Sequence, residues 1–265
     1  MFASLIVSTL GFLVLPAGGN PASTSPAIPG QVIDITAGDF FFRSPTTARP
    51  GLTTIRLRSP HGGHQFELFR LDDGHGVIDL VNAMTAKKPT PWAKEMGGAG
   101  FPPIGGTVNA SYILEVGTYA ILCEVHDKKD GKRHYQKGMF TELKIAGKRV
   151  AGKLPPPEIT VTEVDNKWNF SKPITAGPHV VLVTNAGTVA HELKILRILP
   201  GLSFAEAKAW KPGQPRTDEQ FATVTTMSPG VSVITSINFR PGKYLLWCVP
   251  QVKKGMIQEL TVPRN

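Results

Sequence analysis

The feature that most limits the possible folds of this chain is an internal repeat that spans most of its 265 residues. The segment "VIDITAGDFFFRSPTTARPGLTTIRLRSPHGGHQFELFRL" has a counterpart in "EITVTEVDNKWNFSKPITAGPHVVLVTNAGTVAHELKILRI". In both segments apolar and polar residues alternate along short runs, as they do in strands that bury one face. A histidine opens the third run of each copy, His64 in the first and His191 in the second. A repeat of this length predicts two similar domains in tandem.

The ends of the two copies match as well. "VGTYAILCEVH" corresponds to "PGKYLLWCVPQ", and "KGMFTELKI" corresponds to "KGMIQELTV". Cys123 therefore matches Cys248 and Met139 matches Met256, but the first copy has eight extra residues between its cysteine and methionine. Two cysteines in an oxidising compartment commonly form a disulfide. We expect none here, because equivalent buried positions in separate domains do not meet within bonding distance.

Short strand-like runs separated by Gly and Pro turns favour an all-β fold, and the chain has 27 Gly and 23 Pro. We expect a first domain over residues 30–147, a short linker over 148–157 and a second domain over 158–265. Each copy also carries one short helical stretch between its histidine and its cysteine. These stretches are "GVIDLVNAMTAKK" and "SFAEAKAW", and Ser203 is the expected N-cap of the second.

The N-terminus begins with an apolar run that is followed by small residues and prolines. The run is shorter than the roughly 20 residues that span a bilayer, so we expect a signal peptide over about residues 1–27. The mature protein would then be periplasmic or secreted. An uncleaved anchor is the alternative, and only in that case is membrane association expected.

The formal net charge of +9 favours acidic partners. The lysines are scattered, and no nucleic-acid-binding motif accompanies them, so a nucleic-acid partner is not expected.

Each copy has a histidine at a strand start, then Gly-x-Tyr, a cysteine, and Gly-Met before a final strand. This order resembles the cupredoxin superfamily, which includes plastocyanin and azurin, and the resemblance covers both copies. It implies two tandem Greek-key β-sandwich domains. It also implies a type 1 copper held by the upstream histidine, the cysteine, a second histidine and a methionine. Two imidazoles, a thiolate and a weak axial thioether suit both oxidation states of copper, and hence electron transfer.

In the first copy the resemblance implies one copper held by His64, Cys123, His134 and Met139. His126 is the alternative second imidazole, because it lies at the shorter spacing from Cys123 that is usual in the family. However, "HYQKGM" aligns with "QVKKGM" of the second copy, which favours His134.

The eight extra residues contain an Asp-Gly pair, which is typical of a two-residue hairpin turn. Such a hairpin would pair Lys129 with Lys132 and Asp127 with His134, and would return His134 to Cys123. Asp127 would then orient the imidazole of His134.

The second copy supplies His191, Cys248 and Met256, but Gln251 stands where a histidine is expected. An amide oxygen is a poor substitute for an equatorial imidazole, so we expect no type 1 copper there.

These observations favour an exported copper protein that carries electrons to a redox partner, and the basic charge suggests that this partner is acidic. A metal-free cupredoxin-like module used for binding or structure is the alternative. An enzyme of the multicopper oxidase or nitrite reductase type is disfavoured, because the chain has no His-x-His motif and no histidine beside either cysteine.

Overall fold

The computed structural model describes residues 30–211 and 213–264, so the predicted signal peptide lies outside the described residues. The first half contains α1 (Val77–Thr85), the 3-10 helix η1 (His134–Lys137) and ten strands, which are β1 (Gln31–Gly38), β2 (Phe41–Arg43), β3 (Thr47–Ala48), β4 (Gly51–Arg58), β5 (Glu67–Leu71), β6 (Ala93–Glu95), β7 (Ala99–Gly100), β8 (Thr107–Leu114), β9 (Gly117–Leu122) and β10 (Phe140–Ile145).

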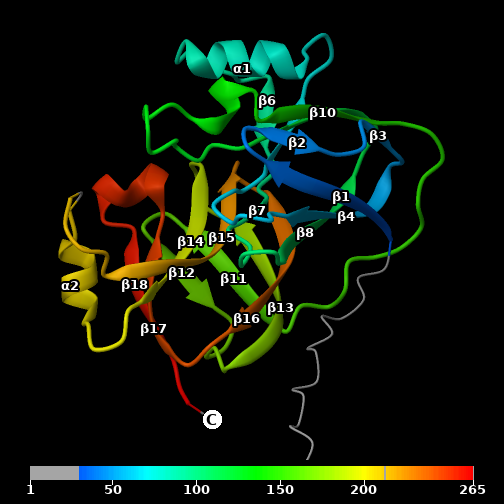
Figure 1. Ribbon diagram of the computed structural model, residues 1–265. Coiled ribbons are helices and arrows are strands. Elements are labelled where there is room, and N and C mark those ends of the chain that lie inside the picture. The colour runs from blue at the N-terminus through cyan, green and yellow to red at the C-terminus, as the bar shows by residue number, and fades with distance from the viewer. Residues whose placement is uncertain (1–29, 212, 265) are drawn as a thin grey trace, which may run out of the picture.

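The second half contains α2 (Phe204–Ala209), the 3-10 helix η2 (Val249–Lys254) and eight strands, which are β11 (Ile159–Val164), β12 (Lys167–Phe170), β13 (Gly177–Asn185), β14 (His191–Ile198), β15 (Asp218–Met227), β16 (Ser232–Phe239), β17 (Gly242–Trp247) and β18 (Ile257–Val262). The expected all-β fold is confirmed, and one short α-helix lies in each half (Figure 1). Among the described residues, no helix has the length and apolar character needed to cross a bilayer.

The two halves have the same strand pairing. In the first, β1 runs parallel to β4, which pairs with β8, and a second sheet contains β5, β9 and β10. In the second, β11 runs parallel to β13, which pairs with β16, and a second sheet contains β14, β17 and β18. Each half is therefore a β-sandwich whose two sheets bury their alternating apolar residues against each other.

Two strand pairings join the halves. Ser111 of β8 pairs with Ile234 of β16, which makes one sheet of eight strands that crosses the whole molecule. β7 leaves the first half and pairs with β15 at the edge of a sheet of the second half (Figure 1). The sequence predicted the strands of each half but not these contacts between them.

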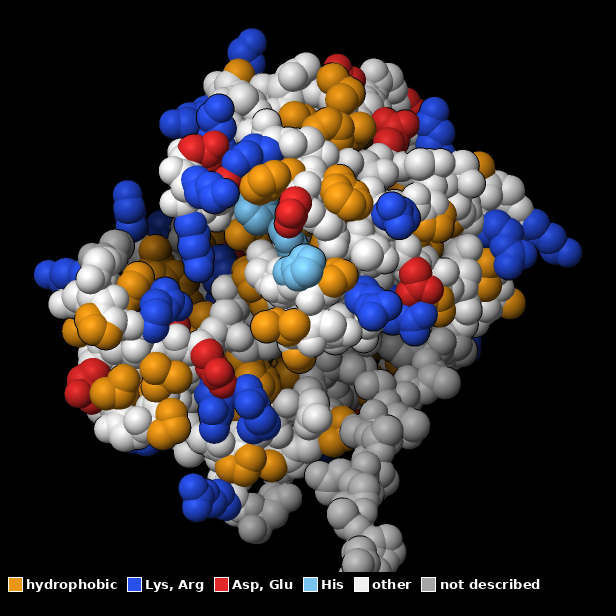
Figure 2. Space-filling view, in the orientation of Figure 1, with side chains coloured by type: hydrophobic (Ala, Val, Ile, Leu, Met, Phe, Trp, Pro, Cys, Tyr) orange, Lys and Arg blue, Asp and Glu red, His pale blue; other side chains and the backbone are white. Residues whose placement is uncertain are grey.

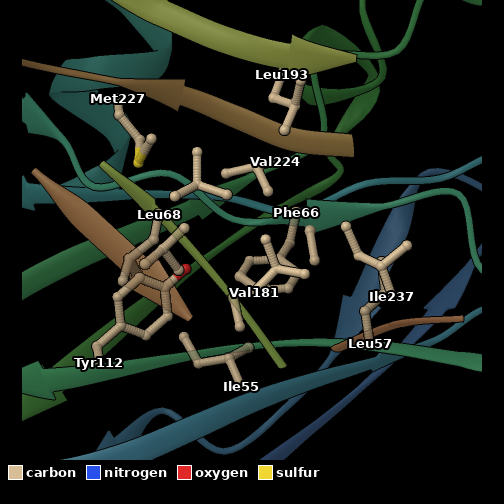
Figure 3. Close-up of a cluster of buried hydrophobic side chains, with 14 of the residues drawn as sticks. Ile55, Leu57, Phe66, Leu68, Tyr112, Val181, Leu193, Val224, Met227 and Ile237 are labelled. Carbon is tan, nitrogen blue, oxygen red and sulfur yellow. The ribbon is translucent and has the colours of Figure 1, made fainter. Parts of the chain in front are cut away.

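The hydrophobic core is also continuous between the halves. Phe66 and Leu68 of the first half lie beside Val224 and Met227 of the second (Figure 3). Gly98 fits between the halves, because a Cβ at that residue would lie 2.0 Å from the carbonyl oxygen of Phe66 in the first half and 2.9 Å from Oγ1 of Thr225 in the second. The two halves therefore pack as one body.

Both helices lie where the sequence placed them. Ser203 caps α2, since its Oγ accepts a hydrogen bond from the backbone N–H of Glu206 at 3.2 Å, as predicted. The segment 148–157 contains no strand, and Val150 fastens it to the first half by donating to the carbonyl of Pro50 at 2.7 Å.

A buried tyrosine closes the turn before the strand that leads to each cysteine. The hydroxyl of Tyr119 in β9 donates to the carbonyl of Glu115 at 3.1 Å, and the hydroxyl of Tyr244 in β17 donates to that of Arg240 at 2.6 Å. The hydroxyl of Tyr119 also accepts from the backbone N–H of Glu115, and the hydroxyl of Tyr244 accepts from the backbone N–H of Arg240. These bonds fix the strands that position Cys123 and Cys248.

Candidate metal centre

Four segments of the first half bring the predicted ligands to one end of the sandwich. His64 lies in the turn before β5, Cys123 directly follows β9, His134 begins η1, and Met139 precedes β10. Backbone hydrogen bonds join the last three: Cys123 N donates to Met139 O at 3.1 Å, and Met139 N donates to His134 O at 3.0 Å. The fold therefore fixes the loop that carries these residues.

The side chains of His64, Cys123 and His134 converge. Sγ of Cys123 lies 3.5 Å from Nδ1 of His134 and 3.9 Å from Nδ1 of His64, and the two Nδ1 atoms are 3.2 Å apart. Cys123 and Met139 are fully buried in the same cluster, His134 is buried and His64 is half-buried. One thiol and two imidazoles thus face a common point close to the surface.

These separations fit a single metal ion. Metal–nitrogen bonds of about 2.0 Å and metal–sulfur bonds of about 2.3 Å, set at trigonal or tetrahedral angles, place the ligand atoms roughly 3.3–3.7 Å apart. The observed distances of 3.2, 3.5 and 3.9 Å scatter about this range. The donor set of two imidazoles, a thiolate and a thioether is one that suits copper.

The described residues place His134, and not His126, beside Cys123. His126 is exposed and pairs with Arg133 across a hairpin, while the N–H of His134 donates to the carbonyl of Val125 at 2.8 Å. η1 then turns the imidazole of His134 towards the thiol.

The predicted register of the hairpin is wrong by two residues. The sequence paired Asp127 with His134, whereas the structure pairs His126 with Arg133 and closes a longer turn over residues 127–132. Two aspartates hold this turn by local bonds that compete with a two-residue turn: Oδ1 of Asp127 accepts from Lys129 N, and Oδ1 of Asp130 accepts from Lys132 N, both at 3.0 Å.

Asp127 therefore has another role than the one expected. Its second carboxylate oxygen pairs with the ammonium group of Lys137, so among the described contacts it does not hold the His134 imidazole. Phe40 supports that imidazole instead, with ring centroids 5.0 Å apart in an edge arrangement, and Lys137 lies 4.0 Å from the centroid of the Phe40 ring. Phe40 has a positive φ of 60°, which no sequence pattern indicated.

Burial keeps the three groups uncharged when no metal is bound. It lowers the pKa of His64 to about 4, with a further contribution from the neighbouring His134. Burial likewise lowers the pKa of His134 and raises that of the Cys123 thiol to about 11. The imidazoles therefore offer free lone pairs at neutral pH, and the thiol must release a proton to bind a metal.

No protein-family model and no curated protein sequence matches the chain. Solved structures do resemble it. Reduced auracyanin from Roseiflexus castenholzii is 19% identical over 44% of this chain and 98% of its own, with a TM-score of 0.30. Rusticyanin from Thiobacillus ferrooxidans is 18% identical over 43% and 76%, with a TM-score of 0.29. A multicopper oxidase is 14% identical over 87% of both chains, with a TM-score of 0.25.

Each half is a β-sandwich that carries a histidine, a cysteine and a methionine at matching places, as the internal repeat predicted. Each half of the chain has a cupredoxin-like fold.

The second cupredoxin-like half has a similar but incomplete set of residues. Nδ1 of His191 lies 3.8 Å from Sγ of Cys248, and Met256 is fully buried in the same cluster. Gln251 lies in η2, which starts directly after Cys248, and the residue is 9% exposed. Both cysteines are free and buried, so the expectation of no disulfide is confirmed.

Two further histidines have ordinary surroundings. His61 is exposed in the turn before His64. His179 bonds to Glu158 at 2.9 Å and to the carbonyl of Thr175 at 2.9 Å, in β13 and far along the chain from either cysteine.

Sequence reasoning missed a group of carboxylates between the halves. Glu67 is buried and its pKa lies well above the ordinary value, because burial disfavours its charge and other glutamates lie nearby. Burial likewise raises the pKa of Glu95 to about 7 and that of Glu124. The sequence signal is that Glu67 and Glu192 stand soon after the two matching histidines, at the start of β5 and β14, where the structure buries both.

Proposed function

We propose that this chain is an exported electron-transfer protein that binds one type 1 copper in its first half, through His64, Cys123 and His134, with Met139 as a weaker fourth ligand. The observation that carries the proposal is the convergence of one cysteine sulfur and two histidine nitrogens within 4.8 Å of one another. When bound, copper would supply a centre that gains and loses one electron.

The surrounding protein supports fast electron exchange by holding the ligands in place. Tyr135 N donates to Cys123 O at 2.9 Å, and Gly138, at φ 105°, ends η1 so that the chain turns directly into Met139 and β10. Because backbone bonds hold the ligand loop without a metal, a change of charge at the site would cause little rearrangement. His64 is half-buried, which offers a short route from the site to the solvent.

The surface over the site suits a protein partner. Phe41 and Ile104 are exposed hydrophobic residues on segments next to the ligand-bearing turns, with 46% and 83% of their surface accessible. Figure 2 shows histidine side chains at the surface with hydrophobic and basic groups nearby. The turn between His126 and Arg133 adds the exposed residues Lys128, Lys129 and Lys132. Apolar contact within a basic rim favours an acidic redox protein.

Copper loading tests the site. Apo protein given one equivalent of Cu(II) is expected to develop strong visible thiolate-to-copper absorption and a narrow EPR hyperfine splitting. His134→Ala should lose both signals, whereas the matched control His126→Ala should keep them. A His134→Ala protein that retains the signals would refute the ligand assignment, and a colourless wild-type protein would favour a metal-free module.

Reduction kinetics test the electron-transfer role and the partner. An acidic redox protein is expected to reduce the copper-loaded protein faster than a basic one does, with a rate that falls as salt is added. Replacing Lys128, Lys129 and Lys132 with glutamate should slow the reaction without changing the spectrum. Equal rates for acidic and basic reductants would contradict the proposed partner.

Export is tested separately by N-terminal sequencing of protein recovered from the producing cells, where an intact N-terminus would contradict cleavage.

A further inference from the structure

The second half has kept three of the four residues that form the site of the first. Sγ of Cys248 lies 3.8 Å from Nδ1 of His191, close to the 3.9 Å between Cys123 and His64. His191, Cys248 and Met256 are each 0% exposed. The thiol and the imidazole therefore share one closed environment, and Met256 is buried in the same core as Cys248.

Backbone bonds hold this loop as they hold the loop of the first half. Cys248 N donates to Met256 O at 3.3 Å, and Met256 N donates to Gln251 O at 3.3 Å. The corresponding bonds of the first half join Cys123, Met139 and His134 in the same order. The loop of the second half therefore has the form of a ligand loop, although it carries one ligand fewer.

The imidazole of His191 is oriented for binding. Its Nε2 lies 3.0 Å from Oδ1 of Asp165, a carboxylate that Thr188 also holds through its N–H at 3.1 Å and its hydroxyl at 2.7 Å. Because the ionised carboxylate can only accept, Nε2 donates to Asp165, and Nδ1 is the ring nitrogen that faces Cys248 and would bind a metal. Gly187 allows this contact, since a Cβ there would lie 2.5 Å from both His191 Nε2 and Asp165 Oδ1.

Two features of this site favour Cu(I) over Cu(II): it lacks a second imidazole, and it is buried. An amide oxygen at Gln251 is a weak partner for Cu(II), whereas thiolate and thioether sulfur favour Cu(I). Cu(I) bound to a thiolate is neutral as a pair, but Cu(II) would leave a positive charge in a site without solvent access. In the first half the positive charge of a bound Cu(II) would lie close to water, because His64 is only half-buried.

We propose that the second half is a separate, colourless Cu(I) site formed by Cys248, His191 and Met256, and that it holds the ion in one oxidation state. Binding forms copper bonds to the sulfur atoms of Cys248 and Met256 and to Nδ1 of His191; the S–H bond of Cys248 breaks, and its proton passes to solvent as the ion enters. No electron is transferred in this step. The N–H of Glu192, 3.4 Å from Sγ of Cys248, donates to the thiolate that results.

Cu(I) titration of the reduced protein tests this site independently of the blue one. Under anaerobic conditions, with a chromophoric Cu(I) chelator as competitor, wild-type protein is expected to bind two equivalents. Cys248→Ser and Cys123→Ser should each bind one, and the double variant none. Cu(II) should give the same blue spectrum in Cys248→Ser as in wild type. Binding of as many equivalents by Cys248→Ser as by wild type would overturn the proposal, whatever the first half binds.

A more conservative substitution separates loss of Cu(I) binding from loss of folding. Met256→Leu preserves volume and removes only the thioether, so it should weaken the second Cu(I) equivalent at least tenfold with unchanged circular dichroism. Met139→Leu is the matched control and should leave that equivalent unchanged. Wild-type affinity for both equivalents in Met256→Leu would exclude Met256 as a ligand.

Discussion

Glu163 provides a quantitative test of the energetics of this fold. Its side chain is 0% exposed, Oε1 accepts from Nε1 of Trp168 at 3.2 Å, and Oε2 has no partner among the described residues. Burial raises the pKa of this carboxyl to about 8 from an ordinary value of 4.5, and the charge of Glu192 adds to the effect. Glu163 is therefore neutral in the folded protein at neutral pH.

The sign and the size of the effect follow from proton binding. Between these two pKa values the folded state binds a proton that the unfolded state has released, so the free energy of unfolding falls as the pH rises. The contribution is fully present below the unfolded pKa and is lost as the pH passes the folded one. With pKa values of 4.5 and about 8, the loss between about pH 5 and pH 9 is about 4 kcal/mol.

Urea denaturation of wild type and Glu163→Gln at these two pH values measures this loss. Because glutamine is neutral at both, the wild type should lose about 4 kcal/mol more than the variant. Glu206→Gln is the control: the pKa of this exposed carboxyl is lowered by its bonds to Ser203, so its titration is complete below the tested range. Equal pH dependence in wild type and Glu163→Gln would refute the argument.

Three further substitutions test the packing. Tyr119→Phe removes the buried hydroxyl that bridges the N–H and C=O of Glu115, and should lower the free energy of unfolding in urea by about 1 kcal/mol; an unchanged midpoint would show that the bridge is dispensable. Ser203→Ala removes the cap of α2 and should cost about 1 kcal/mol in the same assay, with a neutral result contradicting the cap. Gly98→Ala forces a Cβ against Phe66 O and Thr225 Oγ1 and should lower the melting temperature by calorimetry, whereas an unchanged value would contradict the close packing around Gly98.

The sequence predicted most of what depends on local pattern. Period-two alternation located the strands, and the N-cap rule located the start of α2 at Ser203. The internal repeat favoured His134 over His126, although simple spacing favoured the reverse, and the structure places His134 beside Cys123. This choice was possible because the internal repeat aligns the ligand loop of the first copy with the matching loop of the second.

Features that depend on contacts between distant residues could not be predicted. The edge pairing of β7 with β15 involves only a few residues without any alternation, so nothing in residues 99–100 indicates a strand. The hairpin register failed because the side chains of Asp127 and Asp130 bond to nearby backbone N–H groups and stabilise a longer turn. The support of His134 by Phe40 depends on a positive φ that the sequence does not reveal.

The central claim is that Cys123, and not Cys248, forms the coloured copper site. The most direct measurement is the visible absorption and EPR spectrum of Cys123→Ser and Cys248→Ser after addition of one equivalent of Cu(II). We expect Cys248→Ser to keep the thiolate-to-copper band at wild-type strength and Cys123→Ser to lose it entirely. A band that survives in Cys123→Ser, or one that disappears in Cys248→Ser alone, would contradict the account.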